Sequence, residues 1–518
     1  MRSFICGSFV LFLFVFSIKS NADHILGNDI TYRCSSTNDS IYYIKFNFYR
    51  DCNGCYVLGQ SPKCGTSENC NSSQTAPTSL TLSCASGSTL GTISMTRTSI
   101  TDITKTCKNE ISRCQQPCNG SYPYGIERHT FEGTVDLRKF IKNGCCRFKV
   151  SVLLYVRGAK ITTGMQQQGF YTFVEFDACK KPCNASPQLT NDPVAIVCCN
   201  QPYFFNNGAV DTVNYDSLSY SLAPAYQASG SQVSYTSPYS ATYPMKAYFV
   251  GSMKPPQSNP NTDPPIGIFL DPETGDLIFT PTECDQQAVV VMQIDEWRKD
   301  DKGKWVNIGM TRRDMQFIVQ TCPSNNPPKI TNKTFKYSVC AGSSICFDIT
   351  TEDKVFVPPP PASTPPPDTV TLTWNRGIPG ATFKIKNYKA REKTGEFCWT
   401  PNKNQASDLP YTFTATAIDD HCPKNAVTTR SFSILVKYIA EADRNVDTFA
   451  CGKYYIESNP IANFRGTPSY FWEVTDTNNQ LLNKSYYYFK PSNSLYSNKK
   501  SDTIQFRKGG KYIIHHRI

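Results

Sequence analysis

Two stretches of the chain have the same form: Asp271-Pro272-Glu273-Thr274-Gly275-Asp276-Leu277-Ile278-Phe279-Thr280-Pro281 and, 120 positions later, Lys393-Thr394-Gly395-Glu396-Phe397-Cys398-Trp399-Thr400-Pro401. Each contains a Thr-Gly pair that predicts a turn, because glycine takes positive φ freely. Each ends in Thr-Pro, and proline ends a strand because it has no N–H to donate to the ladder. Between these signals the alternation predicts that Leu277 and Phe279, and likewise Phe397 and Trp399, point inward.

The sequence around these stretches repeats as well. Each is followed by an apolar or alternating strand, over Val289 to Ile294 and over Tyr411 to Ala417, that closes on two acidic residues. An Arg and a further alternating strand come next in both copies, and Val197-Cys198 and Val339-Cys340 stand in equivalent places before them. Short strands between turn signals, without helical periodicity, predict an all-β chain with two tandem antiparallel β-sandwiches.

The first 22 residues have the features of a secretory signal peptide. Arg2 precedes an apolar run from Phe9 to Phe16, and Ser20-Asn21-Ala22 places small residues where a signal peptidase cuts. The run is too short to span a bilayer, and no later segment is long enough to do so. We therefore expect cleavage after Ala22 and secretion, with no transmembrane segment.

The 23 cysteines predict disulfide bonds. Cys6 leaves with the signal peptide, and the other 22 are more than a reducing compartment would hold as thiols. Thirteen of them lie between Cys34 and Cys183, so the first domain is expected to depend most on disulfides. A metal site at Cys52 with Cys55, or at Cys114 with Cys118, is the lesser alternative because no nearby His completes a tetrahedral set. The disulfide candidates, with no pairing assigned, are Cys34, Cys52, Cys145, Cys146, Cys179, Cys340, Cys346, Cys398 and Cys422.

The net charge of +11 is concentrated at the C-terminal end. Residues 484–518 carry eight basic side chains and one acidic one, a net charge of +7. In a secreted protein such a patch meets acidic polysaccharide or cell envelope more readily than nucleic acid, so no nucleic-acid partner is expected. A solvated strand face is the simpler explanation, and we favour it.

Several motifs are specific enough to indicate a family. They are Asp23-His24-Ile25-Leu26-Gly27-Asn28-Asp29-Ile30-Thr31-Tyr32, Arg50-Asp51-Cys52-Asn53-Gly54, Thr130-Phe131-Glu132-Gly133-Thr134-Val135, Cys145-Cys146-Arg147, Thr190-Asn191-Asp192-Pro193-Val194 and Asn375-Arg376-Gly377-Ile378-Pro379-Gly380. Over nearly its whole length the chain resembles the large secreted or surface proteins of gliding Bacteroidota, which use type IX secretion.

This resemblance implies surface architecture with Ig-like, cadherin-like and polycystic-kidney-disease-type (PKD) domains, and it brings no catalytic residues. The chain departs from the family in two ways. Cys55, Cys64 and Cys70 lie in an additional Cys-rich loop, and no C-terminal sorting domain follows Ile518. A fragment of a longer protein, or a different route of export, is therefore expected.

Proline-rich and polar clusters indicate where domains meet, since few contacts cross such segments. Within the third domain, residues 358–367 hold seven prolines in ten, which favours a stiff hairpin insertion over a ligand for a proline-binding groove. The predicted organisation is a signal peptide over 1–22, a Cys-rich β domain over 23–183, Ig- or cadherin-like sandwiches over 184–323 and 324–438, and a PKD-type sandwich over 439–518.

No catalytic motif is evident in the sequence. It contains no Gly-x-Ser-x-Gly, no His-Glu-x-x-His and no phosphate loop, and it has only five histidines. Asp295 and Glu296 point to opposite faces of a strand, so this pair cannot flank one sugar bond. We therefore expect that the protein is not an enzyme.

Calcium is the cofactor that the sequence suggests, because hard cations bind several oxygens and acidic residues gather at the strand ends. The alternative, which we favour slightly, is that these acids only solubilise strand ends and form turns. The candidate ligands are Asp211, Asn214, Asp216 and Asp295 in the second domain, and Glu352, Asp353, Asp368 and Asp419 in the third.

Aromatic residues make up 13% of the chain, which raises the possibility of sugar stacking. Most lie at strand positions that serve cores, but in Tyr486-Tyr487-Tyr488-Phe489 four successive rings must point to both faces. We predict a non-enzymatic secreted or cell-surface architectural or adhesion protein. Its partner is an unknown extracellular ligand, a polysaccharide or a surface protein. The alternative is a carbohydrate-binding accessory protein.

Overall fold

The computed structural model describes residues 25–518, apart from 53–76, 116–121, 159–160, 166–167, 181, 194–195, 323, 438–441, 451, 461–467 and 509–510. The predicted signal peptide and the additional Cys-rich loop lie outside the described residues. The described chain is almost entirely β, as predicted. Its helical elements are the short α1 (Arg138–Lys142) and one 3-10 turn (Lys403–Gln405).

The largest sheet has 14 strands and contains strands from both of the first two predicted domains. Its main path is β4 (Thr89–Ser94), β3 (Ser79–Cys84), β7 (Arg147–Val156), β8 (Gly169–Asp177), β19 (Trp305–Gln320), β1 (Ile25–Cys34), β2 (Ile41–Asp51), β6 (Ile126–Asp136) and β5 (Thr96–Asp102). Joined to this path are β10 (Ile196–Cys198), β13 (Ser217–Leu222), β14 (Tyr226–Ala228), β15 (Ser231–Gln232) and β18 (Gln287–Lys299).

Strand β19 connects the first segment of the described chain (residues 25–183) with the second (residues 184–323). It pairs with β18 along its length, and its other edge pairs in succession with β8, β1 and β10. The boundary predicted after residue 183 therefore falls inside one continuous sheet. In the pairing of β1 with β19, Asn28 lies opposite Asp314, 286 positions later in the chain. A pairing between residues so far apart leaves no local signal in the sequence.

Buried ion pairs lie along the contact between β19 and the first segment. Arg313 Nε lies 3.0 Å from Asp29 Oδ2, and both side chains are almost fully buried. The same carboxylate accepts hydrogen bonds from Asn47 and from the Tyr49 hydroxyl, both at 2.8 Å. Because these donors surround it, the buried Asp29 carboxylate is not left without partners.

The internal repeat predicted from the sequence is present in the topology. The second segment has the order β10-β19-β18-β13, with β10 parallel to β19. The third has the order β21 (Lys336–Cys340), β27 (Val427–Lys437), β26 (Tyr411–Ile418) and β23 (Thr371–Trp374), with β21 parallel to β27. Gly275 has a φ of 76° and forms the predicted turn. Gly395 instead lies within β25 (Thr394–Trp399), where a Cβ would come within 2.1 Å of the Phe383 ring. The inward positions are as predicted, with Leu277, Phe279, Phe397 and Trp399 all buried.

The remaining strands form smaller sheets. The second segment adds β11 (Tyr203–Phe205) with β17 (Leu277–Phe279) and β16 (Ile268–Leu270), and β12 (Ala209–Val210) with β9 (Gln188–Leu189). The third segment (residues 324–437) forms a β-sandwich, called the third sandwich below. One of its sheets contains β20 (Lys329–Ile330), β22 (Ile345–Glu352), β25 (Thr394–Trp399) and β24 (Thr382–Ile385). It packs against a second sheet of β21 (Lys336–Cys340), β27 (Val427–Lys437), β26 (Tyr411–Ile418) and β23 (Thr371–Trp374).

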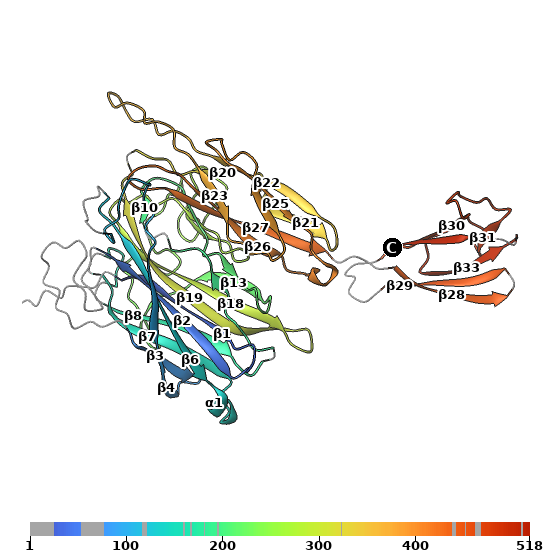
Figure 1. Cartoon of the computed structure of the whole chain (residues 1–518), viewed down its shortest axis with the longest axis horizontal. Coiled ribbons are helices and arrows are strands. Elements are labelled where there is room, and N and C mark those ends of the chain that lie inside the picture. Colours follow the sequence, from blue (N-terminus) through green and yellow to red (C-terminus); the bar gives the residue numbers. More distant parts are fainter. Residues whose placement is uncertain are drawn as a thin grey trace, which may run out of the picture.

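The last segment forms a separate β-sandwich, which stands apart from the other three in Figure 1. Its core contains Trp472, Tyr487, Phe489 and Ile504. Its two sheets are β28 (Ala442–Ala450), β29 (Lys453–Pro460), β33 (Ser501–Phe506) and β31 (Tyr487–Lys490), and β32 (Tyr496–Ser497), β30 (Phe471–Thr475) and β34 (Ile513–Arg517).

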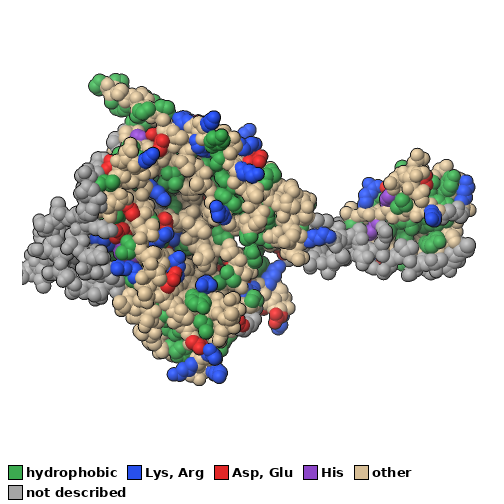
Figure 2. All heavy atoms as spheres, in the orientation of Figure 1, with side chains coloured by type: hydrophobic (Ala, Val, Ile, Leu, Met, Phe, Trp, Pro, Cys, Tyr) green, Lys and Arg blue, Asp and Glu red, His purple; other side chains and the backbone are tan. Residues whose placement is uncertain are grey.

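The third sandwich is joined to both earlier segments. Cys107 and Cys422 form a disulfide across a sequence separation of 315 residues. Arg430 Nε lies 3.3 Å from Asp276 Oδ2 of the second segment. The first three segments therefore form one body, from which the proline-rich loop between β22 and β23 projects (Figures 1 and 2).

The structure pairs all of the predicted disulfide candidates except Cys340, which is exposed and has a free thiol. Among the described residues, the later segments also contain disulfides, two within the second segment and one within the third, alongside their hydrophobic cores. Cys52 is bonded to Cys114, so neither is available for the alternative metal site, whose other members, Cys55 and Cys118, lie outside the described residues. The bonded pairs are Cys34–Cys183, Cys52–Cys114, Cys84–Cys145, Cys107–Cys422, Cys146–Cys179, Cys198–Cys322, Cys199–Cys284 and Cys346–Cys398.

Among the described residues, no helix combines the length and the apolar character that crossing a membrane requires.

Replacing Asp29 by Ala should lower the free energy of unfolding by roughly 3 to 5 kcal/mol, because Arg313 would remain buried without its counter-charge. The measurement is urea unfolding of the oxidised protein. Asp136→Ala is the matched control. It breaks an ion pair to Arg138 whose side chains are about half exposed (55% and 49%), so its cost should stay below about 1 kcal/mol. Equal costs in the two variants would contradict the role given to the buried pair.

Candidate metal centre

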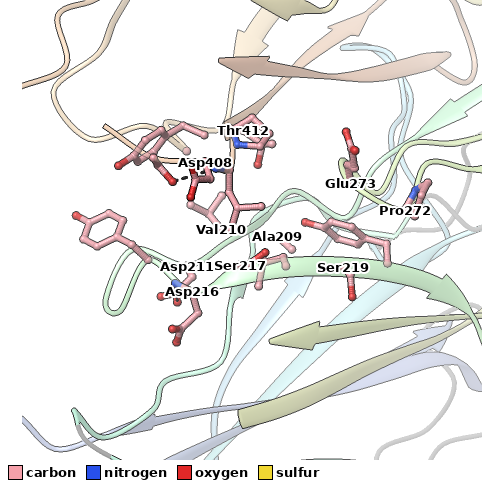
Figure 3. Close-up of a pocket in the computed structure, with 18 of the residues that line it drawn as sticks. Ala209, Val210, Asp211, Asp216, Ser217, Ser219, Pro272, Glu273, Asp408 and Thr412 are labelled. Atoms are coloured by element: carbon pink, nitrogen blue, oxygen red, sulfur yellow. Dashed lines mark hydrogen bonds between the residues drawn. The ribbon is translucent and has the colours of Figure 1, made fainter. Parts of the chain in front are cut away.

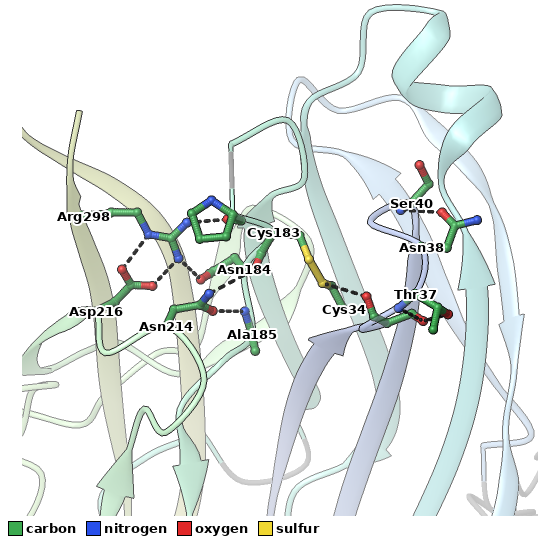
Figure 4. Close-up of a disulfide and its surroundings, with 12 residues drawn as sticks. Cys34, Thr37, Asn38, Ser40, Cys183, Asn184, Ala185, Asn214, Asp216 and Arg298 are labelled. Carbon is green, nitrogen blue, oxygen red and sulfur yellow. Dashed lines mark hydrogen bonds and ion pairs between the residues drawn. A yellow bond between two sulfur atoms is a disulfide. The ribbon is translucent and has the colours of Figure 1, made fainter. Parts of the chain in front are cut away.

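The acidic residues predicted to bind calcium in the second domain do not converge on one point. Asp216 forms a two-point ion pair with Arg298, with Nε–Oδ1 and Nη2–Oδ2 distances of 2.6 and 2.5 Å (Figure 4). Asp211 accepts the backbone N–H groups of Val213, Asn214 and Asp216, and so closes a turn.

The other two members of that set also have protein partners. The Asn214 side chain accepts the Ala185 N–H at 3.0 Å and donates to the Cys183 carbonyl at 3.2 Å, beside the Cys34–Cys183 disulfide (Figure 4). Asp295 accepts a hydrogen bond from the Asn307 amide at 3.2 Å. The structure therefore does not assemble the second-domain set as a cation site, because a guanidinium and N–H donors already occupy these oxygens.

The third domain does bring its predicted acids together. Asp353 follows β22, Asp368 precedes β23 and Asp419 follows β26, so all three lie at one end of the sandwich. One carboxylate oxygen from each lies within 4.8 Å of the others, and Asp353 and Asp419 are both 3% exposed. Glu352, predicted for the same set, instead lies 3.9 Å from Lys354.

Burial and the crowding of these carboxylates shift their pKa values. Burial, together with repulsion from the nearby Asp419 and Asp368, raises the pKa of Asp353 from 3.8 to about 7. Burial also raises the pKa of Asp419 to about 6, although hydrogen bonds from Asn325, Ala426 and His421 oppose that rise. Near neutral pH the centre thus holds negative charge that the surrounding protein does not fully offset.

Residues that the sequence reasoning missed surround this centre. Asn325 Nδ2 donates to Asp419 Oδ2 at 2.8 Å, and His421 Nδ1 lies 3.1 Å from Asp368 Oδ2. Arg391 Nη1 donates to the main-chain carbonyls of both Asp353 and Asp368, at 2.9 and 3.1 Å. Arg391 thereby holds together the two ends of the proline-rich loop. Only their positions next to strand ends or to the predicted linker could have indicated these residues.

The donor set suits a hard cation. Asp353 Oδ2 is buried and has no hydrogen-bond partner among the described atoms, although it lies within a cluster of three acids. A buried carboxylate oxygen without a donor is costly, and a cation would remove that cost. Carboxylate oxygens are the ligands that calcium and magnesium prefer, whereas zinc favours nitrogen and sulfur. These residues therefore fit calcium.

A cleft of about 400 Å³ lies between the second and third segments, and Figure 3 shows residues of both facing it. Its acids are paired, since Asp216 binds Arg298 and Asp408 lies 3.4 Å from Lys299. Tyr215 also lines the cleft. It is 56% exposed and has a φ of 56°, in the left-handed region that bulky residues rarely adopt.

The aromatic run from Tyr486 to Phe489, in the last sandwich, does not form an open surface on which a sugar could stack. Tyr487 and Phe489 are buried in the core, as alternation requires. The other two rings are covered by cations, with Lys508 Nζ 4.1 Å from the centre of the Tyr486 ring and Arg507 Cζ 4.6 Å from that of Tyr488. This arrangement leaves these rings less open to a sugar than the sequence suggested.

Comparison with solved structures finds tandem Ig-like and cadherin-like domains. A three-Ig fragment of titin is 10% identical, with a TM-score of 0.21 over 64% of this chain and 94% of that one. The EC1–4 fragment of protocadherin gamma-B3 is 10% identical, with a TM-score of 0.20 over 48% of this chain and 57% of that one. The EC1–3 fragment of mouse protocadherin gamma-C3 is 10% identical, with a TM-score of 0.20 over 46% of this chain and 74% of that one. Similarity at this level carries no argument about function. No family model matches the chain, and no curated protein does.

The acidic centre should make stability depend on pH when divalent cations are removed. Both pKa values are higher in the folded state than the ordinary 3.8, so the folded state binds protons more tightly than the unfolded one. The resulting stabilisation is complete below about pH 4 and is lost as the pH rises through about 6 and about 7. Unfolding in chelator should therefore become easier between about pH 4 and about pH 7.

Asp353→Asn should reduce this pH dependence, because the amide does not titrate in this range. Asp348→Asn is the matched control, since Asp348 lies on the same sandwich but is partly exposed and pairs with Lys386 at 3.1 Å. A slope that is unchanged by Asp353→Asn would mean that other groups dominate the titration.

Proposed function

We propose that the chain is a secreted or cell-surface architectural protein that presents tandem β-sandwiches for adhesion or matrix contact. Its disulfides favour an oxidising compartment outside the cytosol. The partner would be an extracellular polysaccharide or surface protein. Binding of labelled protein to intact cells and to purified envelope polysaccharide would test this role, and binding to neither would argue against it.

The observation that supports this role best is the union of three segments into one body. Strand β19 pairs with strands of the first two segments, and the Cys107–Cys422 disulfide ties the third to the first. A body joined in this way keeps its surfaces at fixed relative positions, whereas domains on flexible linkers do not. Fixed spacing suits a scaffold that bears load or holds out a binding face.

The motifs quoted from the sequence support a finer proposal. They favour membership of the secreted and surface proteins of gliding Bacteroidota, with a PKD-type fourth sandwich. The β-sandwich formed by residues 442–518 is compatible with that type. Expression in a type IX-secreting bacterium, with and without that system, would test the route of export.

We also propose that calcium binds at Asp353, Asp368 and Asp419 and stiffens the third sandwich next to its linker. The buried Asp353 Oδ2, which has no hydrogen-bond partner within the described part of the chain, supports this proposal most directly. Asn325 belongs to the linker that joins the second and third segments and contacts Asp419, so a cation here would act on the junction between them.

Calcium at about 5 mM should raise the free energy of unfolding by about 1 to 2 kcal/mol, given the dissociation constants of about 0.1 to 1 mM that are typical of extracellular modules. The measurement is thermal unfolding of the whole protein in calcium and in chelator at matched ionic strength. Asp353→Asn should abolish the increase. In chelator this variant should itself be more stable than the native protein, because the amide removes repulsion from the centre.

Asp216→Asn is the control for that experiment. It breaks the ion pair with Arg298 and should lower stability, but the increase on adding calcium should persist because Asp216 is not part of the centre. Loss of the calcium response in Asp216→Asn together with its retention in Asp353→Asn would place the cation in the second domain instead.

Carbohydrate binding is a second candidate function, favoured by the cleft between the second and third segments. Concave sites at domain junctions commonly bind ligands, and the exposed Tyr215 offers a ring for stacking. Tyr215→Ala should then lower binding on a glycan array at least several-fold. Tyr388→Ala, which removes a ring that is 71% exposed outside the cleft, should leave binding unchanged. Absence of any glycan signal from the native protein would remove this candidate.

A further inference from the structure

A serine, a histidine and an aspartate form a continuous hydrogen-bonded chain at the junction of the segments. Ser324 Oγ lies 3.0 Å from His421 Nε2. On the other side of the ring, His421 Nδ1 lies 3.1 and 3.3 Å from the two oxygens of Asp368. Nucleophile, base and orienting carboxylate are recognised by this geometry and not by their order in the chain.

The partners of His421 determine the tautomer of its ring. An ionised Asp368 carboxylate only accepts hydrogen bonds, so Nδ1 must carry the proton and donate it. Nε2 is then an acceptor, and the Ser324 hydroxyl donates to it. This is the tautomer in which a histidine takes a proton from a serine hydroxyl.

The protein holds both loops of this chain in place. His421 is 9% exposed, its N–H donates to Asp419 Oδ1, and its carbonyl accepts from the Asn425 amide. The next residue, Cys422, is bonded to Cys107. Cys322, two residues before Ser324, is bonded to Cys198. Anchoring of this kind preorganises a site because the groups need not be ordered at the moment of reaction.

A cavity of about 230 Å³ adjoins the pair, and both Ser324 and His421 line it. Much of the remaining wall is apolar and comes from all three segments, with Tyr122, Pro123, Pro423 and Ala426 among its residues. Ser324 itself is exposed. A small apolar group can therefore occupy the cavity beside a serine that a reagent can reach.

We propose that Ser324 is a nucleophile, with His421 as its base and Asp368 as the positioning residue, and that the site accepts esters with a short apolar acyl group. In the first step Ser324 Oγ bonds to the acyl carbon, its proton passes to His421 Nε2, and the alcohol leaves with that proton. Water then cleaves the acyl-serine, releases the carboxylic acid and restores the hydroxyl. No other reactant is needed.

This inference goes beyond the proposed architectural role and departs from the expectation of no enzyme. It rests on two hydrogen bonds and a cavity, and not on the calcium proposal, although Asp368 belongs to both sites. The test is therefore run in chelator, so that a failure of calcium binding does not affect the outcome.

The experiment treats the oxidised full-length protein with a fluorophosphonate probe, which transfers its phosphorus to an activated serine with loss of fluoride. We expect stoichiometric labelling that mass spectrometry maps to Ser324, together with hydrolysis of 4-nitrophenyl butyrate. Ser324→Ala should abolish both signals. His421→Gln should slow labelling by about 100-fold, because general-base assistance contributes on the order of 10²- to 10⁴-fold.

Ser343→Ala is the matched control, since it removes an exposed turn serine of the same sandwich outside the cavity and should label like the native protein. Thermal unfolding of each variant separates loss of chemistry from loss of fold. If Ser324 in the folded native protein labels no faster than in the urea-unfolded protein, the hydrogen-bonded chain only fastens the linker to the sandwich, and the proposal is overturned.

Discussion

The ion pair between Arg313 and Asp29 is the contact on which the arrangement of the first two segments depends. The two residues face each other in the register of β19 and β1, and both side chains are buried. A shift of one residue would turn Arg313 to the opposite face and leave Asp29 without its counter-charge. Burying charge is expensive, so the pair specifies one register strongly even where its net contribution to stability is small. Its placement in turn fixes β18 and β10, which pair with the same strand.

That arrangement brings three segments to one junction, where the residues of both candidate sites lie. The acidic centre occupies one end of the third sandwich, and the linker residues Ser324 and Asn325 reach its side chains from the second segment. The first segment contributes Cys107, which holds the loop carrying His421. Sites built at such junctions need all of the contributing segments in place, because the wall of the cavity and the disulfides that hold its loops come from the first two segments as well as the third.

Much of the fold could be predicted from the sequence, because apolar side chains in the strands of the repeat alternate with a period of two and clear turn signals separate the strands. Leu277 and Phe397 occupy the inward positions that alternation assigns them. The third-domain acids could be found because each stands beside a strand end. The second-domain set could not be excluded, since Arg298, which neutralises Asp216, is 82 residues away. Ser324 and His421 are 97 residues apart and lie in no local motif, so only the folded chain brings them together.

The disulfide between Cys107 and Cys422 also determines how the protein would transmit mechanical tension. It closes a covalent loop across a sequence separation of 315 residues. Force applied between the two ends of the chain would pass from the first segment directly into the end of the third. The second segment and most of the third lie inside the loop, so tension cannot pull them out to their full length while this bond is intact. A surface protein under shear would then extend first at its last sandwich, while the junction, with its acidic centre and its cavity, kept its shape.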